Sequence, residues 1–198
     1  MNIISCSQAL IKYNIDESNY IHDSCIFIET VKDSGIKIGK NNVIGPGCVI
    51  WLGTGYRNNT ILGSDNYIGA GSTIKPDVIL GNNNILDASV FLGLQSCIQD
   101  NAKLESFVSI SEYSTIGSYS YIGTLTPVIK DVLPFSKVFG NPASLKGINT
   151  TKLMSETFSE HQLKEIRSFL SSDIEPEDIM LISIIDNYIN QARKKPVK

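Results

Sequence analysis

An aliphatic residue recurs every six positions between Ile38 and Val128. These two residues are 90 positions apart, which is fifteen hexads without an insertion, and only Tyr56 breaks the aliphatic series. A small or slim residue lies four positions after most of the repeating residues, as at Cys48 and Ser72. A repeat of this length is typical of a solenoid, and it restricts the possible folds more than any other feature of the sequence.

A hexad is a whole number of two-residue strand periods, so each one can form a short extended segment with two side chains facing inward. Three hexads make one triangular coil, and successive coils stack at a strand spacing of ~4.8 Å. An amphipathic helix would need apolar residues at spacings of three and four, where this sequence is mostly polar or Gly. We therefore predict an all-β solenoid. Its corners are expected to use unusual dihedral angles at Asn pairs and at the glycines that follow the repeating residues: Gly39, Gly45, Gly63, Gly69, Gly81, Gly93, Gly117 and Gly123.

The composition indicates a globular chain with no nucleic-acid partner. Its 198 residues are 42% hydrophobic and carry a net charge of −3. No apolar run approaches ~20 residues, and the start has no basic segment followed by an apolar stretch, so we expect no membrane insertion and a cytoplasmic location. The four cysteines show no CxxC spacing, which predicts reduced thiols and no metal site.

The repeat divides the chain into three parts. Residues 1–20 are expected to be an irregular extension with room for one strand, residues 21–143 the solenoid, and residues 144–198 a helical appendage that covers its open end. The Ser159–Gln162 capping box predicts one helix, and Pro176 lies near the start of a second. The apolar faces are expected to consist of Leu163, Ile166, Phe169 and Leu170 in the first helix and of Ile179, Ile182, Ile185 and Ile189 in the second. The basic C-terminal residues are expected to be a solvated helix end.

Several segments resemble known enzymes. The hexads, the Asn19–Ile26 opening, the Val128–Pro134 exit and the Phe139–Ala143 segment (Phe-Gly-Asn-Pro-Ala) are similar to those of the left-handed β-helix acyltransferases. Within that family the chain resembles the UDP-N-acetylglucosamine acyltransferases and the N-acyltransferases of nucleotide-linked amino sugars. The resemblance implies a left-handed parallel β-helix, a homotrimer with active sites between subunits, and an acyl donor as co-substrate.

The sequence departs from this family at its catalytic histidine. Many of these enzymes use a histidine to deprotonate the attacking hydroxyl, but the resemblance aligns that histidine with Pro76 of this chain. Two further active-site histidines align with Gln95 and Ser111, which we take as candidate substrate-binding residues. The two histidines present, His22 and His161, are expected at the surface. A γ-class carbonic anhydrase is excluded as well, because it needs three histidines on zinc.

Carboxylates are the candidate bases that remain. Asp87 and Glu105 each follow a repeating residue and are 18 positions apart, so they should stack on neighbouring coils, where ionising one raises the pKa of the other. Asp77 and Glu112 are rival bases, because they lie along the edge that carries the family's histidines. The alternative is that charged corner residues only keep the solenoid soluble.

Two further sets of residues complete the predicted site. Arg57 and Lys75 are also 18 positions apart, and a stacked pair of cations would suit a pyrophosphate. Arg57 belongs to the one disturbed hexad, for which a small loop and local degeneration of the repeat are both open. A backbone N–H near Gly93 or Leu94 is the expected oxyanion donor.

An acyltransferase without a histidine is coherent if its acceptor is an amine, because a neutral amine is already nucleophilic and sheds its proton only from the adduct. The sequence therefore favours transfer of an acyl group from acyl-CoA to the amino group of a nucleotide-linked amino-deoxy sugar. No bound cofactor or metal is expected. A sugar O-acetyltransferase with a carboxylate base and a non-catalytic hexapeptide scaffold are the alternatives.

Overall fold

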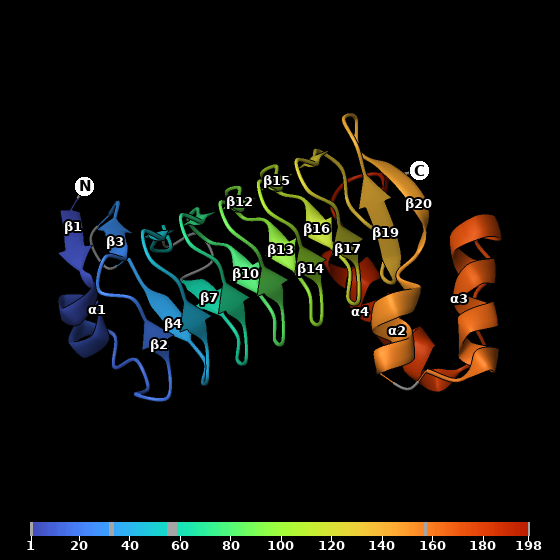
Figure 1. Cartoon of the computed structure of the whole chain (residues 1–198), viewed down its shortest axis with the longest axis horizontal. Coiled ribbons are helices and arrows are strands. Elements are labelled where there is room, and N and C mark those ends of the chain that lie inside the picture. Colours follow the sequence, from blue (N-terminus) through green and yellow to red (C-terminus); the bar gives the residue numbers. More distant parts are fainter. Residues whose placement is uncertain (1, 32–33, 55–58, 157, 198) are drawn as a thin grey trace.

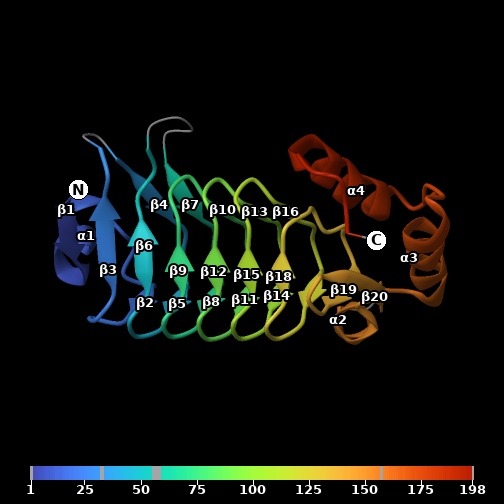
Figure 2. The same ribbon diagram turned by 90° about the horizontal axis from the view of Figure 1, so that it is seen from above.

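The computed structural model describes residues 2–31, 34–54, 59–156 and 158–197. Its main body is a three-sided column of stacked coils, with the N-terminus at one end and the C-terminal helices at the other (Figure 1). Each side is one sheet, and between β2 and β19 neighbouring strands are parallel (Figure 2). The predicted all-β solenoid with a small helical appendage is confirmed.

The three sheets are named by their outer strands. The β1–β18 sheet has the order β1 (Asn2–Ser5), β3 (Ile26–Glu29), β6 (Val49–Trp51), β9 (Thr73–Ile74), β12 (Phe91–Leu92), β15 (Ser109–Ile110) and β18 (Pro127–Val128). The β4–β16 sheet runs through β4 (Ile36–Ile38), β7 (Thr60–Leu62), β10 (Ile79–Leu80), β13 (Cys97–Ile98) and β16 (Thr115–Ile116). The β2–β20 sheet has the order β2 (Tyr20–Ile21), β5 (Val43–Ile44), β8 (Tyr67–Ile68), β11 (Ile85–Leu86), β14 (Lys103–Leu104), β17 (Tyr121–Ile122), β19 (Ser136–Phe139) and β20 (Ser144–Ile148).

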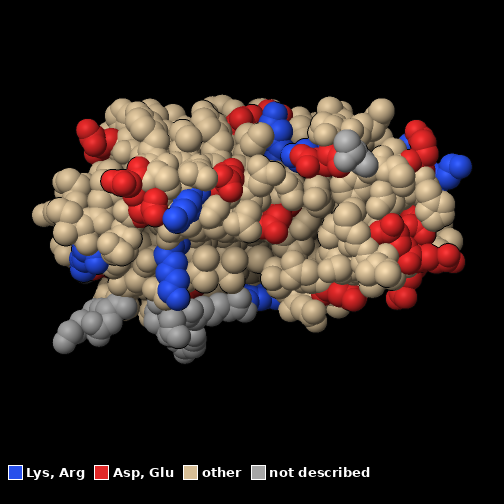
Figure 3. All heavy atoms as spheres, turned by 90° about the horizontal axis from the view of Figure 1, so that it is seen from below, with Lys and Arg blue, Asp and Glu red and all other residues tan. Residues whose placement is uncertain are grey.

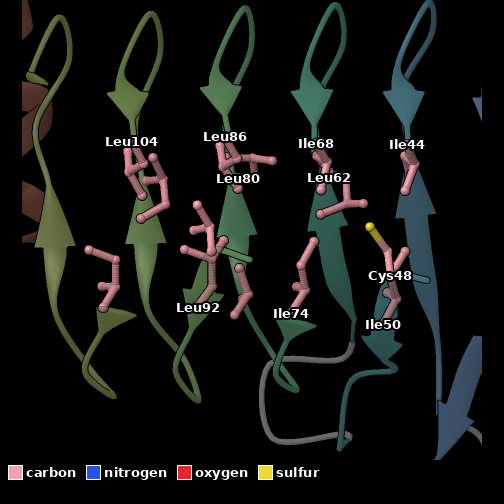
Figure 4. Close-up of a cluster of buried hydrophobic side chains, with 14 of the residues drawn as sticks. Ile44, Cys48, Ile50, Leu62, Ile68, Ile74, Leu80, Leu86, Leu92 and Leu104 are labelled. Atoms are coloured by element: carbon pink, nitrogen blue, oxygen red, sulfur yellow. The ribbon is translucent and has the colours of Figure 1, made fainter. Parts of the chain in front are cut away.

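The core is the column that the hexads predict. The repeating aliphatic residues from Ile44 to Val128 are buried, and they point into the centre of the coils (Figure 4). Cys48 also points inward, and all four cysteines are buried free thiols. At the corners that follow the β4–β16 sheet, stacked asparagines are joined by hydrogen bonds from one coil to the next. Asn42 accepts hydrogen bonds from the backbone and side chain of Asn66, whose own side-chain oxygen accepts from the Asn84 N–H.

The prediction of uninterrupted hexads is wrong at one place. Strand partners in the two coils on either side of the disturbed hexad are 24 residues apart, as in Ile44↔Ile68. In the later coils strand partners are 18 residues apart, as in Ile79↔Cys97. The residues before and after the additional hexad contact the coil at one point. The N–H groups of Gly53 and Thr60 both donate to the carbonyl of Gly35, at 2.9 and 3.1 Å. The disturbed hexad is therefore an insertion, and all stacking predicted across it shifts by one edge.

The predicted role of the glycines is also wrong. None of the eight glycines that follow repeating residues has a positive φ; the corner positions with positive φ are occupied by residues such as Asn41, Asn83 and Asn101. The glycines are required by close packing between coils instead. A Cβ on Gly63, for example, would lie 2.4 Å from the carbonyl oxygen of Gly81.

The N-terminal extension is more ordered than predicted. Strand β1 pairs antiparallel with β3, and helix α1 (Cys6–Lys12) follows directly. The sequence carries the signal for this helix, because Ser5 and Gln8 form a capping box. The extension caps the first coil by burying Cys6 and Ala9 against it.

The appendage contains helices α2 (Thr150–Ser155), α3 (Glu160–Ser172) and α4 (Ile179–Gln191), of which α2 was not predicted. The capping box of α3 is confirmed, and Leu163 and Ile166 are buried. The predicted apolar face of α4 is wrong. Its inward residues are Leu181, Ile185 and Tyr188, whereas three of the four predicted isoleucines are exposed, by 84% at Ile179, 38% at Ile182 and 60% at Ile189. None of the helices within the described ranges has the length and apolar character that a membrane crossing would need.

The chain after α4 folds back onto the solenoid, so the predicted solvated end is wrong for the backbone and for Lys194, whereas Arg193 and Lys195 are exposed. The buried carboxylate of Asp131 accepts from the backbone N–H groups of Arg193 and Lys194, at 2.6 and 2.7 Å. The Lys194 ammonium donates to the carbonyl of Glu112 at 2.5 Å and to the Ser114 hydroxyl at 2.9 Å. Val197 is buried in the main core.

Candidate active site

The predicted stacking of Asp87 and Glu105 is confirmed. They follow β11 and β14, whose register pairs Leu86 with Leu104, and the Asp87 N–H donates to the carbonyl of Leu104 at 2.9 Å. Two positions before each carboxylate, a second row of outward side chains crosses the same sheet. This row aligns Ile85, Lys103, Tyr121 and Lys137 on successive strands.

The two carboxyl groups have different surroundings. Glu105 accepts from the Lys103 ammonium at 2.9 Å and from the Tyr121 hydroxyl at 2.9 Å. Lys103, followed by the hydroxyl of Tyr121, lowers the pKa of Glu105. Burial and the adjacent Glu105 raise the pKa of Asp87. Burial, followed by the hydrogen bond to Glu105, raises the pKa of Tyr121 to about 12. The two carboxyl pKa values are therefore shifted in opposite directions, that of Glu105 downward mainly by Lys103 and that of Asp87 upward by burial and by Glu105.

Glycines border the pair on both sides. Gly69 precedes Asp87 along this edge, and a Cβ there would lie 2.6 Å from the carbonyl carbon of Asp87. Gly123 follows Glu105, and the ring of Phe139 lies over it, because a Cβ on Gly123 would overlap that ring. Phe139 also packs against Tyr121, with ring centroids 5.4 Å apart. The pair is therefore bounded by an aromatic wall at Gly123 and by a position without a side chain at Gly69.

A cavity of about 370 Å³ lies on the same sheet, and neither Asp87 nor Glu105 is among its lining residues. Lys103 and Tyr121, the two residues that bind Glu105, also line this cavity. Its remaining lining comes from the corners before β11 and β14, from β11 and β19, and from α2 with the residue before it: Asn83, Ile85, Asn101, Ala102, Lys137, Asn149, Thr151, Lys152 and Ser155. Three of the lining side chains are lysines, so the cavity suits an anionic group.

The lysines of the cavity differ in their partners. Lys103 pairs with Glu105, and Lys152 pairs with Glu156 at 2.5 Å. The Lys137 ammonium lies over the rings of Tyr121 and Phe139, 5.5 and 5.4 Å from their centroids, and among the described residues it has no carboxylate partner. On the face that Figure 3 shows, acidic side chains gather at the end formed by the C-terminal helices. Lys137 is thus the lysine best placed to meet an incoming anion.

The structure places the rival bases elsewhere. Asp77 is 1% exposed, and its oxygens accept from the backbone N–H and the hydroxyl of Thr54, at 2.8 and 2.5 Å. These bonds fix the start of the inserted hexad and leave Asp77 no route to a substrate. Glu112 is exposed and lies on the edge after the β1–β18 sheet, which is not the edge that carries Asp87.

The structure describes only one member of the predicted cation pair, Lys75. Arg57 lies outside the described residues. Because of the insertion, the residue aligned with Lys75 is Trp51, and the Lys75 ammonium lies 3.9 Å from the centroid of its indole ring. Lys75 therefore makes a cation–π contact at its own edge.

The remaining predicted residues lie on the Lys75 edge as well. The Gly93 N–H donates to the Ile110 carbonyl at 2.9 Å, so it is not available to an oxyanion. The Leu94 N–H has no acceptor among the residues the structure describes and remains a candidate. Gln95 accepts from Arg193 at 3.5 Å, and Ser111 is half-buried on the next coil. Within one subunit, none of these groups is on the edge that carries Asp87 and Glu105.

The prediction missed four residues: Lys103 and Tyr121, which bind Glu105, and Lys137 and Lys152, which line the cavity. A signal for two of them was available, because Lys103 and Tyr121 are 18 positions apart and each stands two positions before an edge residue. Lys137 and Lys152 follow the end of the repeat, so spacing could not have placed them. The two histidines are away from the pair: His22 contacts Ser24, and His161 lies in α3.

No protein-family model matches the chain. In sequence, it is 36% identical over 70 residues to the acyl-[acyl-carrier-protein]–UDP-N-acetylglucosamine O-acyltransferase of Pseudomonas fluorescens SBW25, a match that covers 35% of this chain and 27% of that protein. The namesake of Sinorhizobium fredii is 28% identical over 96 residues, or 47% of this chain and 36% of that protein. The chain thus matches about a quarter to a third of the length of these curated relatives.

Solved structures resemble the chain over most of its length. LpxA from Acinetobacter baumannii matches with a TM-score of 0.81 and 23% identity, covering 91% of this chain and 79% of that chain. The UDP-N-acetylglucosamine acyltransferase of Francisella novicida matches with a TM-score of 0.77 and 20% identity, covering 92% and 91%. The acetyltransferase domain of PglB from Neisseria gonorrhoeae matches with a TM-score of 0.56 and 18% identity, covering 64% and 57%. The predicted left-handed β-helix and the resemblance to hexapeptide-repeat acyltransferases are confirmed.

Proposed function

Starting from the fold that the chain shares with these acyltransferases, we propose that it transfers an acyl group to a nucleotide-linked sugar. The observation that carries the proposal is the carboxylate pair Asp87–Glu105, whose partners Lys103 and Tyr121 also line a cavity with three lysines. A nucleotide-linked sugar brings two phosphates, which suit the lysines, and an acceptor group that must lose a proton to a base.

We further propose that the acceptor is an amine. The positions aligned with the relatives' histidines carry Pro76, Gln95 and Ser111, and a carboxylate is a weak base for a sugar hydroxyl. A neutral amine attacks a thioester without prior deprotonation, and the proton leaves only from the cationic adduct, which a carboxylate can accept. The product is an amide, and the leaving group is a thiol.

The donor in this proposal is acyl-CoA. The curated relatives carry acyl-carrier-protein in their names, so a carrier protein is the second candidate donor. The Leu94 N–H is the proposed oxyanion donor. Because it lies on a different edge from Asp87, the proposal places the reaction between subunits of a homotrimer, where one chain's Leu94 edge faces its partner's Asp87 edge.

Thioester consumption tests the proposal. The purified protein is offered acetyl-CoA, longer acyl-CoAs or acyl carrier protein, each with a nucleotide-linked amino sugar or with its hydroxyl analogue, and free thiol is measured. We expect release with the amino sugar and none above background with the hydroxyl analogue. Release with the hydroxyl analogue alone would support an O-acyltransferase with a carboxylate base. No release with any pair of substrates would support a non-catalytic scaffold.

The cavity is tested separately through Lys137. We expect Lys137→Met to raise KM for the nucleotide sugar at least tenfold, since it removes a phosphate partner, while kcat changes less. Lys146→Met, on the exposed part of β20, is the matched control and should leave both constants unchanged. An unchanged KM in Lys137→Met would mean that the nucleotide binds elsewhere.

A further inference from the structure

The carboxylate pair is not symmetric, and the difference is built into the strands that carry it. Glu105 is held from two sides, by Lys103 on its own strand and by Tyr121 on the next coil. Both partners are themselves fixed. Tyr121 packs on Phe139, and the Lys103 ammonium lies 6.0 Å from the Tyr121 ring centroid. Glu105 is therefore a positioned carboxylate, and its Oε1 accepts from both partners.

Asp87 has a different environment on the same edge. Among the described residues, the charged groups that face it are Glu105 on the next coil and Lys103 beside Glu105. The preceding coil presents Gly69 at this edge and adds no side chain. Lys137, the remaining cation of this region, lies over Tyr121 and Phe139 rather than at Asp87. Asp87 therefore lies on the side of the pair where the preceding coil adds no side chain.

From this geometry we infer that Asp87 is the carboxylate that takes the proton from the acceptor amine, and that Lys103 and Tyr121 are positioning residues that keep Glu105 as a fixed anion beside it. The inference rests on the proposed function and assigns a different role to each carboxylate of the pair. A fixed neighbouring anion makes Asp87 more basic than an isolated aspartate, which is what a proton acceptor needs near neutral pH.

The step balances without a further reactant. The amine nitrogen forms a bond to the thioester carbonyl carbon, and the N–H proton of the adduct passes to a carboxylate oxygen of Asp87. The C–S bond then breaks, the sulphur leaves with its electron pair, and the proton on Asp87 passes to it. Amine and thioester become amide and thiol, and Asp87 returns to its ionised form.

The first experiment measures protonation without catalysis. The carboxyl carbons of protein labelled with ¹³C-aspartate are titrated by NMR, with Asp87→Asn to assign the Asp87 signal. We expect Glu105→Gln to lower the pKa of Asp87, because a neighbouring negative charge is lost. Lys103→Met and Tyr121→Phe should raise it, because ionising both carboxyls becomes harder. Tyr113→Phe, at an exposed corner of another edge, is the matched control and should leave it unchanged.

The second experiment uses the acyl-transfer assay. Asp87→Asn should lower kcat by about 10² to 10⁴, the usual cost of losing a positioned base. Glu105→Gln should cost less and move the acidic limb of the pH–rate profile downward, whereas Tyr121→Phe should move it upward. These opposite shifts distinguish positioning from a merely structural role.

The possible outcomes separate the inference from the proposed function. The inference is contradicted if Glu105→Gln leaves the pKa of Asp87 unchanged. It is also contradicted if Glu105→Gln loses more activity than Asp87→Asn, even when acyl transfer is present. A protein that shows the expected titrations but consumes no thioester contradicts the proposed function, and with it the catalytic part of the inference, while the positioning by Lys103 and Tyr121 stands.

Discussion

At the scale of single residues, burial separates the acidic groups into structural and accessible ones. Asp87 directly follows the repeating residue Leu86, whereas Asp77 is three positions after Ile74, lies at a corner with φ of 58° and is 1% exposed. Its carboxylate accepts two hydrogen bonds from Thr54, so its surroundings already satisfy it. For Asp87, in contrast, the neighbouring group with the largest effect on its pKa is another carboxylate, that of Glu105. A carboxylate with satisfied oxygens stabilises the fold, and one facing a like charge is suited to chemistry.

We therefore predict that Asp77→Asn destabilises the protein without acting on catalysis. The amide can replace only one of the two acceptor oxygens, and a buried hydrogen bond to a charged group is worth about 1.5–3 kcal/mol. Chemical denaturation should show a loss of about that size, with near-normal kcat in the folded fraction. Asp65→Asn is the matched control, since Asp65 occupies an exposed corner with φ of 59°. Equal stability of the two variants would contradict this role.

At the scale of elements, the C-terminal tail replaces a missing part of the solenoid. At the Lys75 edge, each coil's corner carbonyl accepts from the next coil, as Pro76 does from Gln95 and Leu94 from Tyr113. The series ends at Glu112, because the chain takes a shorter path at this corner and already pairs Val132 with Ile116, 16 residues apart, in the next sheet. The Lys194 ammonium takes the place of the next N–H and donates to the Glu112 carbonyl at 2.5 Å. The tail thus closes the hydrogen-bond series of the final coil.

Lys194→Met should loosen this tail, since the Glu112 carbonyl and the Ser114 hydroxyl lose their donor while the aliphatic part of the side chain is kept. We expect faster hydrogen exchange at the Val197 amide, which donates to Asp131, and earlier proteolysis after α4. Lys195→Met serves as the control, because Lys195 is exposed. If both variants exchange alike, the ammonium is not what holds the tail.

At the scale of the whole molecule, one face of the column is unusually apolar. Tyr20, Val43, Tyr67 and Ile85 lie in register on successive strands of the β2–β20 sheet and are 60, 40, 47 and 43% exposed. A continuous apolar row on a flat sheet commonly marks a contact between proteins. It fits the homotrimer proposed above, in which flat sides of three columns meet.

Light scattering at micromolar concentration should therefore give three times the chain mass of 21.7 kDa. Val43→Asp, in the middle of the apolar row, should shift the mass toward that of the monomer while circular dichroism remains unchanged, because the side chain points away from the core. A monomer in the unaltered protein would contradict the trimer and the proposed site between subunits together.

The sequence alone determined the solenoid, its three sides and the stacking of Asp87 on Glu105, because a six-residue period allows only one pairing of coils wherever it is unbroken. It could not reveal that the hexad containing Tyr56 is an insertion, since its spacing matches the repeat; only the shared carbonyl of Gly35 decides this. The inward face of α4 and the position of Lys194 were likewise decided by packing. Every turn of α4 offers aliphatic residues on more than one side, and the contact surface selects among them.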